Sequence, residues 1–490
     1  MNKSTVVPAL QNTWAESLPG MFEPWTADEV PDPTALIVND SLAKDLKIDV
    51  DWLHSADGTK FLVGNFVVPG MTPVAQAYAG HQFGGYSPVL GDGRALLLGE
   101  LVEPSGNRVD LHLKGSGRTR FSRSGDGKAA VGPMLREYIL GEAMHAYGIP
   151  TSRALAVVAT NQTVRRQEPL PGAVLCRVAS SHIRVGSFQY ASALGVEHLQ
   201  RLLDYSINRH YPELRSSTDQ ALDFFEATMQ RQAELIAKWM HVGFIHGVMN
   251  TDNMAISGET IDYGPCAFMD TYSELTVFSS IDHQGRYAYG RQPYIAQWNL
   301  ARLVEALLPL IHSDPDSAVR IATERLNTFP QRFESAWNKG MKSKLGFASD
   351  AQVSPEFFHR LLACFESSKA DYTNSMRSLS SIARGGVTTV TELADSADFQ
   401  TWKDEWNALL KAQGHAGDAV ATQMDANNPA YIPRNHIVEM ALAAGSNGDL
   451  QPMNELVALL KDPFVKRDGM DEYTSPMPAD WEGYQTFCGT

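Results

Sequence analysis

Cysteine is scarce in this sequence, which contains Cys176, Cys266, Cys364 and Cys488 among 490 residues. None of the four stands in C-x-x-C spacing, which excludes a zinc knuckle and argues against a secreted disulfide framework. We therefore expect reduced thiols. Cys488 lies near the end of the sequence, where a reactive thiol is easier to explain than one buried in a core.

Long apolar runs are missing as well. A membrane-spanning helix needs about 18 consecutive apolar residues. The best stretch, around residues 306–311, is interrupted by Glu305 and Pro309. The first residues, MNKSTVVPALQNTW, show the pattern of neither a secretory nor a transit signal. We therefore expect a cytoplasmic protein without a membrane partner.

Positive charge is in the minority, with 41 Lys and Arg against 56 Asp and Glu and a formal charge of -15. Such a chain repels a phosphate backbone, so we expect no nucleic-acid partner. An anionic ligand must then be held in a local cationic pocket, which clustered Arg and Lys in glycine-rich surroundings would supply. A cluster of this kind lies between Gly91 and Arg184.

The order of the expected elements predicts an α+β fold with two lobes. Residues 95–180 read as strands separated by turns, interrupted by one helix over 131–147. The segments 368–396 and 412–430 are predicted to be surface loops or weak helices. Amphipathic patterns predict helices over 196–207, 220–241, 294–311, 315–327, 354–366, 399–412 and 434–461.

Two features of the small lobe suit a phosphate ligand. Gly91 and Gly93 would let backbone N–H groups approach a phosphate beside Arg94, although a G-x-G before a strand also fits an ordinary turn. Lys114 lies on a predicted strand, and Glu137 lies on an apolar stripe of the following helix. Protein kinases hold nucleotide phosphates with such a pair. The alternative is that both side chains face solvent.

A second cluster has the spacing of a kinase catalytic segment. Asn253 follows His246 by seven positions, as in H-R-D-x-x-x-x-N, and residues 262–264 read Asp-Tyr-Gly in place of D-F-G. Val248 occupies the position of the kinase base and cannot accept a proton. Asp252 offers a carboxylate next door, while Asn253 and Asp262 offer the oxygen ligands that Mg²⁺ takes.

These features predict a transfer that differs from that of kinases. Arg94, Lys114, Arg177 and Arg184 together are more positive charge than a kinase places around ATP, and this suits a pyrophosphate leaving group. A hydroxyl would then attack the α-phosphorus and form an AMP ester. Two alternatives stay open, a small-molecule phosphotransferase of kinase-like fold and a non-catalytic nucleotide-binding pseudokinase.

The chain resembles the selenoprotein O family (SelO, also called YdiU), which consists of protein adenylyltransferases with a pseudokinase fold. The resemblance covers nearly the whole chain. It implies a protein-kinase-like fold divided into an N-terminal extension (1–70), a nucleotide-binding small lobe (71–190), a helical catalytic lobe (191–345) and a C-terminal helical region with a tail (346–490). The motifs that carry it are AGHQFGGY (79–86), LGDGRA (90–95), LKGSG (113–117), RSGDGK (123–128), REY (136–138), HGVMNTDNM (246–254), IDYGP (261–265), GRY (285–287) and WNLARL (298–303).

The resemblance also implies a set of roles. Lys114 would pair with Glu137, Asp252 would accept the proton, and Mg²⁺ or Mn²⁺ would bind Asn253 and Asp262. The product would be AMP on Ser, Thr or Tyr hydroxyls of proteins, and some members use UTP with manganese to transfer UMP. The residues implied to bind ATP are Gly91, Gly93, Arg94, Lys114, Asp126, Gly127, Arg177, Arg184 and Asp262.

For the thiols, the family often carries Sec or Cys near the C-terminus, and Cys488 matches this position. The usual bacterial partner lies along the activation segment, where this chain has Phe278. Cys266 is the nearby thiol. A disulfide between Cys266 and Cys488 is therefore a hypothesis that the resemblance leaves open.

Overall fold

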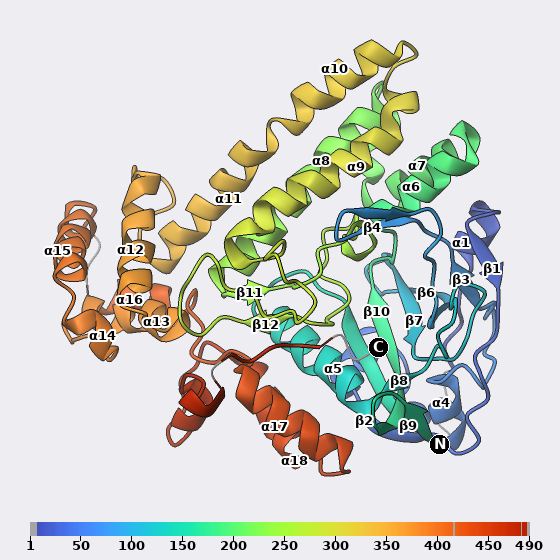
Figure 1. Cartoon of the computed structure of the whole chain (residues 1–490), viewed down its shortest axis with the longest axis horizontal. Helices are drawn as coiled ribbons and strands as arrows, with labels where there is room; N and C mark the ends of the chain where they lie inside the picture. Colours follow the sequence, from blue (N-terminus) through green and yellow to red (C-terminus); the bar gives the residue numbers. More distant parts are fainter. Residues whose placement is uncertain (1–6, 415–416, 482, 488–490) are drawn as a thin grey trace.

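The computed structural model describes residues 7–414, 417–481 and 483–487. Its N-terminal part is built on an antiparallel sheet in the order β1-β3-β6-β7-β10-β9-β2, with the short strand β8 (Ala129–Ala130) paired to β10 (Figure 1). The path consists of β1 (Phe22–Pro24), β3 (Val74–Gln76), β6 (Ala95–Val102), β7 (Arg108–Lys114), β10 (Pro169–Ala179), β9 (Arg153–Arg165) and β2 (Thr34–Val38). A separate hairpin is formed by β4 (Gly80–Gln82) and β5 (Gly85–Ser87).

One face of the sheet packs against N-terminal helices. On β7, Leu111 and Leu113 are fully buried in this layer, and alternation along a strand sends Lys114 to the opposite face. Trp52 and Phe61 belong to the same apolar cluster. The helices of this layer are α2 (Asp40–Asp45), α3 (Val50–Leu53) and α4 (Ala56–Phe61).

The other face packs against helix α5 (Val131–Ala146). Leu135 and Ile139 of α5 lie in one cluster with Leu175 of the sheet. Two helices from the far end of the chain, α17 (Asn435–Ser446) and α18 (Gln451–Leu460), cover α5 in turn (Figure 1). The C-terminal region thereby supports the helix that carries Glu137.

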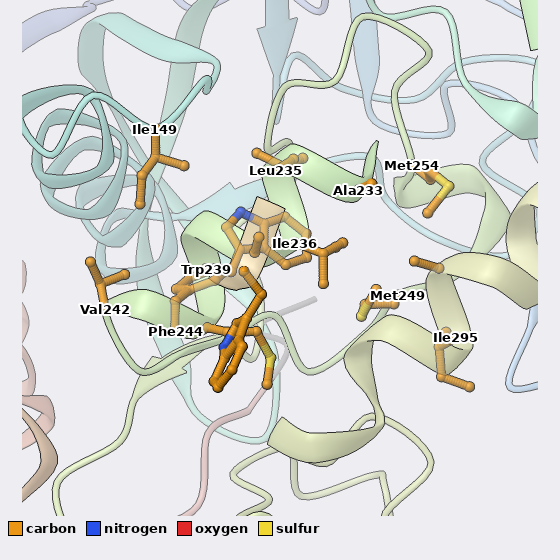
Figure 2. Close-up of a cluster of buried hydrophobic side chains, with 14 of the residues drawn as sticks. Ile149, Ala233, Leu235, Ile236, Trp239, Val242, Phe244, Met249, Met254 and Ile295 are labelled. Atoms are coloured by element: carbon orange, nitrogen blue, oxygen red, sulfur yellow. The ribbon is translucent and has the colours of Figure 1, made fainter. Parts of the chain in front are cut away.

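The second lobe is helical. Figure 2 shows part of its apolar core, where Ile236 and Trp239 of α8 gather with Phe244, Met249 and Ile295. The lobe contains α6 (Val185–Leu194), α7 (Val196–His210), α8 (Gln220–His241), α9 (Gln292–Ile311), α10 (Pro315–Leu326) and α11 (Phe329–Lys344). Short elements between α8 and α9 are β11 (Phe244–Ile245), the 3-10 turn Thr251–Asn253, β12 (Ala267–Phe268) and the 3-10 turn Tyr289–Arg291.

The predicted fold class is confirmed, because a β-rich N-terminal lobe is followed by a helical region as in protein kinases. No helix in the described ranges is long and apolar enough to cross a membrane. The proposed domain boundaries stay predictions. Strands β1 and β2 lie in the predicted N-terminal extension (residues 1–70), and they pair with strands of the main sheet.

The expected helices differ from the structure in several places. The pattern over 434–461 forms α17 and α18, separated by a turn at Gly448, whose φ is +93°. Helices α6 and α11 were not predicted. Residues 368–396 were expected to form surface loops or weak helices, and they contain a helix, α13, whose Tyr372 and Leu379 are buried. The remaining elements are α1 (Thr13–Ser17), α12 (Pro355–Ser367), α13 (Tyr372–Ala383), α14 (Thr391–Ala394), α15 (Ala397–Ala412), α16 (Asp418–Asp425) and the 3-10 turns Pro212–Ser216, Asp471–Thr474 and Ala479–Trp481.

Candidate active site

A cavity of about 800 Å³ lies between the sheet lobe and the segment 248–264. Its walls come from residues that are far apart in the sequence. Glu137 does not line it but contacts Lys114 from behind. The lining includes Gly91, Gly93, Arg94, Lys114, Asp126, Gly127, Arg177, Arg184, Asp252, Asn253 and Asp262.

Three cationic side chains converge on Asp262. Lys114 Nζ donates to Asp262 Oδ1 at 2.8 Å, and Arg177 Nη1 donates to the same oxygen at 2.7 Å. Arg184 Nη2 lies 3.6 Å from Oδ2. Burial alone would raise the pKa of Asp262, but the charges of Arg177, Lys114 and Arg184 hold it well below its usual range. The carboxylate is therefore ionised.

The backbone of Asp262 is itself unusual, with a φ of +61° in the left-handed region. A non-glycine residue in this region is held there by its surroundings, and such residues cluster at functional sites. Lys114 also donates to Glu137, and Arg177 Nη1 lies 3.9 Å from the other oxygen of Glu137. Two carboxylates thus share two cations on this wall.

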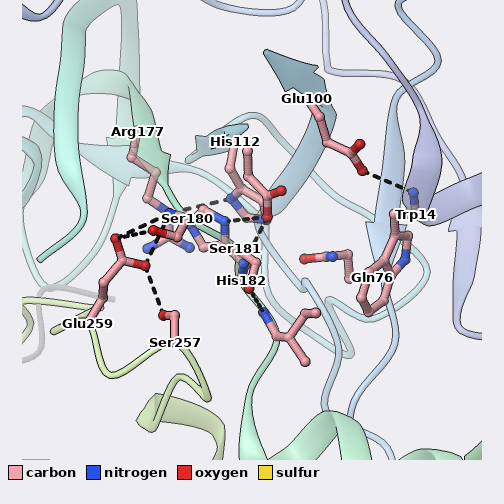
Figure 3. A network of polar contacts seen from close by, with 12 residues as sticks. Trp14, Gln76, Glu100, His112, Arg177, Ser180, Ser181, His182, Ser257 and Glu259 are labelled. Atoms are coloured by element: carbon pink, nitrogen blue, oxygen red, sulfur yellow. Dashed lines mark hydrogen bonds and ion pairs between the residues drawn. The ribbon is translucent and has the colours of Figure 1, made fainter. Parts of the chain in front are cut away.

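A buried imidazole fixes Arg177 from the other side (Figure 3). Arg177 Nε donates to His112 Nδ1 at 3.4 Å. His112 Nε2 lies 3.1 Å from Asp92 Oδ2. Burial lowers the pKa of His112 despite the nearby Asp92 charge, so its single proton lies on Nε2 and is donated to Asp92. The His182 ring stacks on His112 at 4.1 Å. This chain of contacts ties Arg177 to the loop that contains Gly91 and Gly93.

The two glycine-rich loops pack where no side chain fits. Gly91 has a φ of +65°, and a Cβ there would fall 2.3 Å from the Phe121 ring. Gly127 has a φ of +70°, and a Cβ there would fall 2.1 Å from the carbonyl oxygen of Gly117. These positions require glycine, and both glycines line the cavity.

Asp126 is already paired in the structure. Arg166 Nη1 donates to Asp126 Oδ2 at 2.9 Å, and Asp126 Oδ1 accepts from the backbone N–H of Lys128 at 3.0 Å. The hydrogen bond from Arg166 is the main reason that the pKa of Asp126 is lowered. Asp126 therefore orients a cationic side chain, Arg166, that lines the cavity and that the sequence did not indicate.

Asp252 lies on the opposite wall, in the turn Thr251–Asn253. Gln82 Nε2 donates to Asp252 Oδ2 at 3.1 Å. The other carboxylate oxygen is buried and has no hydrogen-bond partner among the residues that the structure describes. Burial raises the pKa of Asp252 to about 6. An under-satisfied carboxylate of this kind suits a proton acceptor.

Asn253 presents its amide in a defined orientation. Its Nδ2 donates to the Val248 carbonyl at 2.9 Å, which leaves the amide oxygen as the atom that can bind a cation. Magnesium is commonly held by one or two protein oxygens together with substrate phosphates. The oxygens of Asn253 and Asp262, which line the same cavity, fit this chemistry. Across residues 7–414, 417–481 and 483–487 no group of three or more His, Cys, Asp or Glu could hold a metal ion.

Two further side chains of the site were missed at the sequence level. Gln82 contacts Asp252. The guanidinium carbon of Arg184 lies over the Tyr78 ring, 4.5 Å from the centroid of that ring. Gln82 belongs to the motif at 79–86, which indicated the family but no role. The hairpin is fixed because His81 N donates to Thr251 Oγ1 at 2.7 Å.

Of the two redox candidates, Cys266 is fully buried, whereas Cys488 lies outside the described residues. The tail nevertheless approaches the predicted partner. Thr486 Oγ1 donates to the Pro265 carbonyl at 2.7 Å, and Thr486 N donates to the Phe278 carbonyl at 2.8 Å. Residues 483–487 therefore contact the segment that follows Asp262.

Comparison with known proteins identifies the family of this chain. The family model described as Protein adenylyltransferase SelO matches residues 8–461. Relatives named Protein nucleotidyltransferase YdiU occur in Mycolicibacterium smegmatis (53% identical, covering 99% of both chains), Pseudarthrobacter chlorophenolicus (52%, covering 100% of this chain and 99% of the relative) and Geobacillus kaustophilus (52%, covering 94% of both). The chain therefore belongs to the SelO family and is an enzyme of the nucleotidyltransferase class.

Proposed function

We propose that this enzyme transfers AMP from ATP to Ser, Thr or Tyr hydroxyls of proteins and releases pyrophosphate. The observation that carries the proposal is the convergence of Lys114, Arg177 and Arg184 in a cavity whose kinase-base position holds Val248. The family description and the names of the relatives support it.

The cationic wall would hold the leaving pyrophosphate. A phosphate chain competes with Asp262 for Lys114, Arg177 and Arg184, since all three cations already contact that carboxylate. Gly91 and Gly127, together with Arg94 and the Arg166 that is paired with Asp126, line the same space. Charge that develops on the leaving group is stabilised there without rearrangement of the loops.

Asn253 and Asp262 would hold the metal ion, Mg²⁺ or Mn²⁺. When bound, the ion would supply positive charge that neutralises phosphate oxygens. The protein's own contribution is to present the two oxygens. Asn253 is oriented by its bond to the Val248 carbonyl, and Asp262 is ionised.

Asp252 would accept the proton of the attacking hydroxyl. The hydroxyl oxygen forms a bond to the α-phosphorus, the bond from that phosphorus to the bridging oxygen breaks, and pyrophosphate leaves with the bonding electrons. The proton passes to the carboxylate of Asp252, one oxygen of which has no partner among the described residues. Gln82 holds the other oxygen.

UTP is a second candidate donor, because the contacts described above concern the phosphate end and the relatives' name, protein nucleotidyltransferase, specifies no base. The two rival functions make different demands. A γ-phosphotransferase needs a base at the Val248 position, and a binding-only pseudokinase needs no proton acceptor beside the metal ligands.

With ATP labelled at the α-phosphate, we expect label on protein Ser, Thr or Tyr residues and release of pyrophosphate, since the cationic wall favours cleavage between the α- and β-phosphates. Label at the γ-phosphate should stay off protein. Intact-mass analysis of the enzyme after incubation with ATP and Mg²⁺ gives the mass of any transferred group directly. Parallel reactions with UTP and Mn²⁺ measure the second donor. Protein-bound γ-label with ADP as product would return the chain to the phosphotransferases.

For the thiols, we expect mild oxidation to join Cys266 to Cys488, because residue 486 already contacts Pro265. Peptide mapping without reductant should find the crosslinked pair, and Cys364→Ser should leave it unchanged. Both thiols found reduced in the oxidised enzyme would remove this hypothesis, and AMP transfer before and after oxidation measures any effect on activity.

A further inference from the structure

A second cavity, of about 930 Å³, lies in the helical lobe and shares no lining residue with the candidate active site. Its walls come from α8 and α11, which pack along each other (Figure 1), and from the loop 426–429. Tyr147 and Phe464 close the apolar side. A cavity of this size can enclose a small organic ligand.

The charged groups of this cavity oppose the charge of the whole protein. Lys238, Arg332, Lys339 and Lys344 line it, against Glu234 alone. Arg332 is paired with Glu226, and Lys238 donates to the Gly148 carbonyl at 2.9 Å. In the described part of the chain, none of the three lysines has a carboxylate within ion-pair distance. In a protein of formal charge -15, such a concentration of positive charge favours an anion.

Lys344 makes the strongest case. It ends α11, its exposed fraction is 3%, and its hydrogen bond is a long one, from Nζ to the Asn427 carbonyl at 3.5 Å. Its Nζ lies 5.9 Å from the centre of the Tyr372 ring. A buried ammonium is costly unless it is paired. Burial lowers the pKa of Lys344 to about 7.

The cavity wall is rigid around this lysine. His241 Nε2 lies 3.0 Å from the Trp337 carbonyl, and a Cβ at Gly340 would fall 2.1 Å from the His241 ring. Burial and then the Lys344 charge lower the pKa of His241, so the ring is neutral and cannot neutralise Lys344. The groups beside Lys344 are thus His241 of α8, the ring of Tyr372 of α13 and the Asn427 carbonyl. None of them carries negative charge.

We propose that this cavity binds a small organic phosphate, with the phosphate against Lys344, Lys339 and Lys238 and the organic part against Ile149 and Phe464. Several separate ammonium groups match a multiply charged anion better than a single carboxylate does. The apolar side excludes water from one face of the ligand.

The proposal is tested on the whole enzyme by competitive acetylation of lysines at several pH values, read for each lysine by mass spectrometry. Without added anion, Lys344 should titrate near pH 7. Phenyl phosphate as the probe should raise this midpoint and slow acetylation at pH 7, by roughly fivefold for a rise of one pKa unit. Lys369, which is exposed, should not change.

Matched variants on one helix separate a site from general screening. Lys339→Gln should weaken the protection of Lys344, because Lys339 lines the cavity, whereas Lys342→Gln should not, because Lys342 does not. Equal protection by sodium chloride at the same ionic strength, or equal effects of the two variants, would overturn the proposal. Equal protection by citrate would overturn the phosphate class. If Lys344 resists acetylation even at pH 9, its amine cannot be reached from the cavity. This result would also overturn the proposal.

Discussion

Asp262→Asn is expected to abolish AMP transfer and metal-dependent ATP binding together. The substitution keeps the shape of the side chain but removes the ionised oxygen that we propose as a metal ligand. Loss of the metal's charge stabilisation is worth several kcal/mol, or about a thousandfold in rate or more. Labelled ATP measures transfer, and calorimetric titration with and without Mg²⁺ measures binding.

The same variant has a second, opposite effect that a merely unfolded enzyme would not show. Without metal, ATP should bind more tightly to Asp262→Asn than to the unmodified enzyme, since Lys114, Arg177 and Arg184 lose the carboxylate that competes with phosphate. Circular dichroism checks that the variant is folded. Metal-dependent binding that survives the substitution would contradict the role of Asp262 as a ligand.

Local patterns predicted those parts of the site that depend on a single element. Alternation along one strand predicted that Lys114 lies on the face opposite Leu113, and helical periodicity over 131–147 predicted a buried position for Glu137. Spacing alone connected His246, Asn253 and Asp262 to a catalytic segment. The structure brings these residues together, with Glu137 behind Lys114, while their roles stay proposals.

Contacts between distant segments could not be predicted in this way. No periodicity indicates that Arg166 pairs with Asp126, or that Gln82 reaches Asp252 across 170 positions of sequence. The same holds for the cations on Asp262, which the sequence indicated only as phosphate ligands. Such pairs form because the fold buries charges that must then be compensated by whatever lies nearby.

Packing also explains one helix that was expected only as a weak surface helix or loop, α13, and one that was not predicted, α11. Helix α13 is rich in serine and threonine, which have weak helix propensity, but burial of Met376 and Leu379 stabilises it. Helix α11 carries Gly340, a helix-weakening residue that is required where His241 packs against the backbone. Tertiary packing decided both segments, and composition alone pointed the other way.

Asp252→Asn is expected to lower AMP transfer by roughly 10²- to 10⁴-fold, the range of a general base. Asparagine fills the same space and can still interact with Gln82, but its amide cannot take the hydroxyl proton. Binding of ATP with Mg²⁺ should stay close to that of the unmodified enzyme, because Asp252 is not a proposed metal ligand. Single-turnover transfer and calorimetric titration measure the two properties separately.

Gln82→Met provides the graded comparison for this division of roles. It removes the hydrogen bond to Asp252 Oδ2 but leaves the carboxylate in place, so transfer should fall by less than in Asp252→Asn while ATP affinity again holds. A loss of ATP affinity in Asp252→Asn as large as that in Asp262→Asn would move Asp252 to the metal site. Full transfer by Asp252→Asn would mean that the hydroxyl loses its proton to another acceptor, and the buried carboxylate of Asp252 would then need a different explanation.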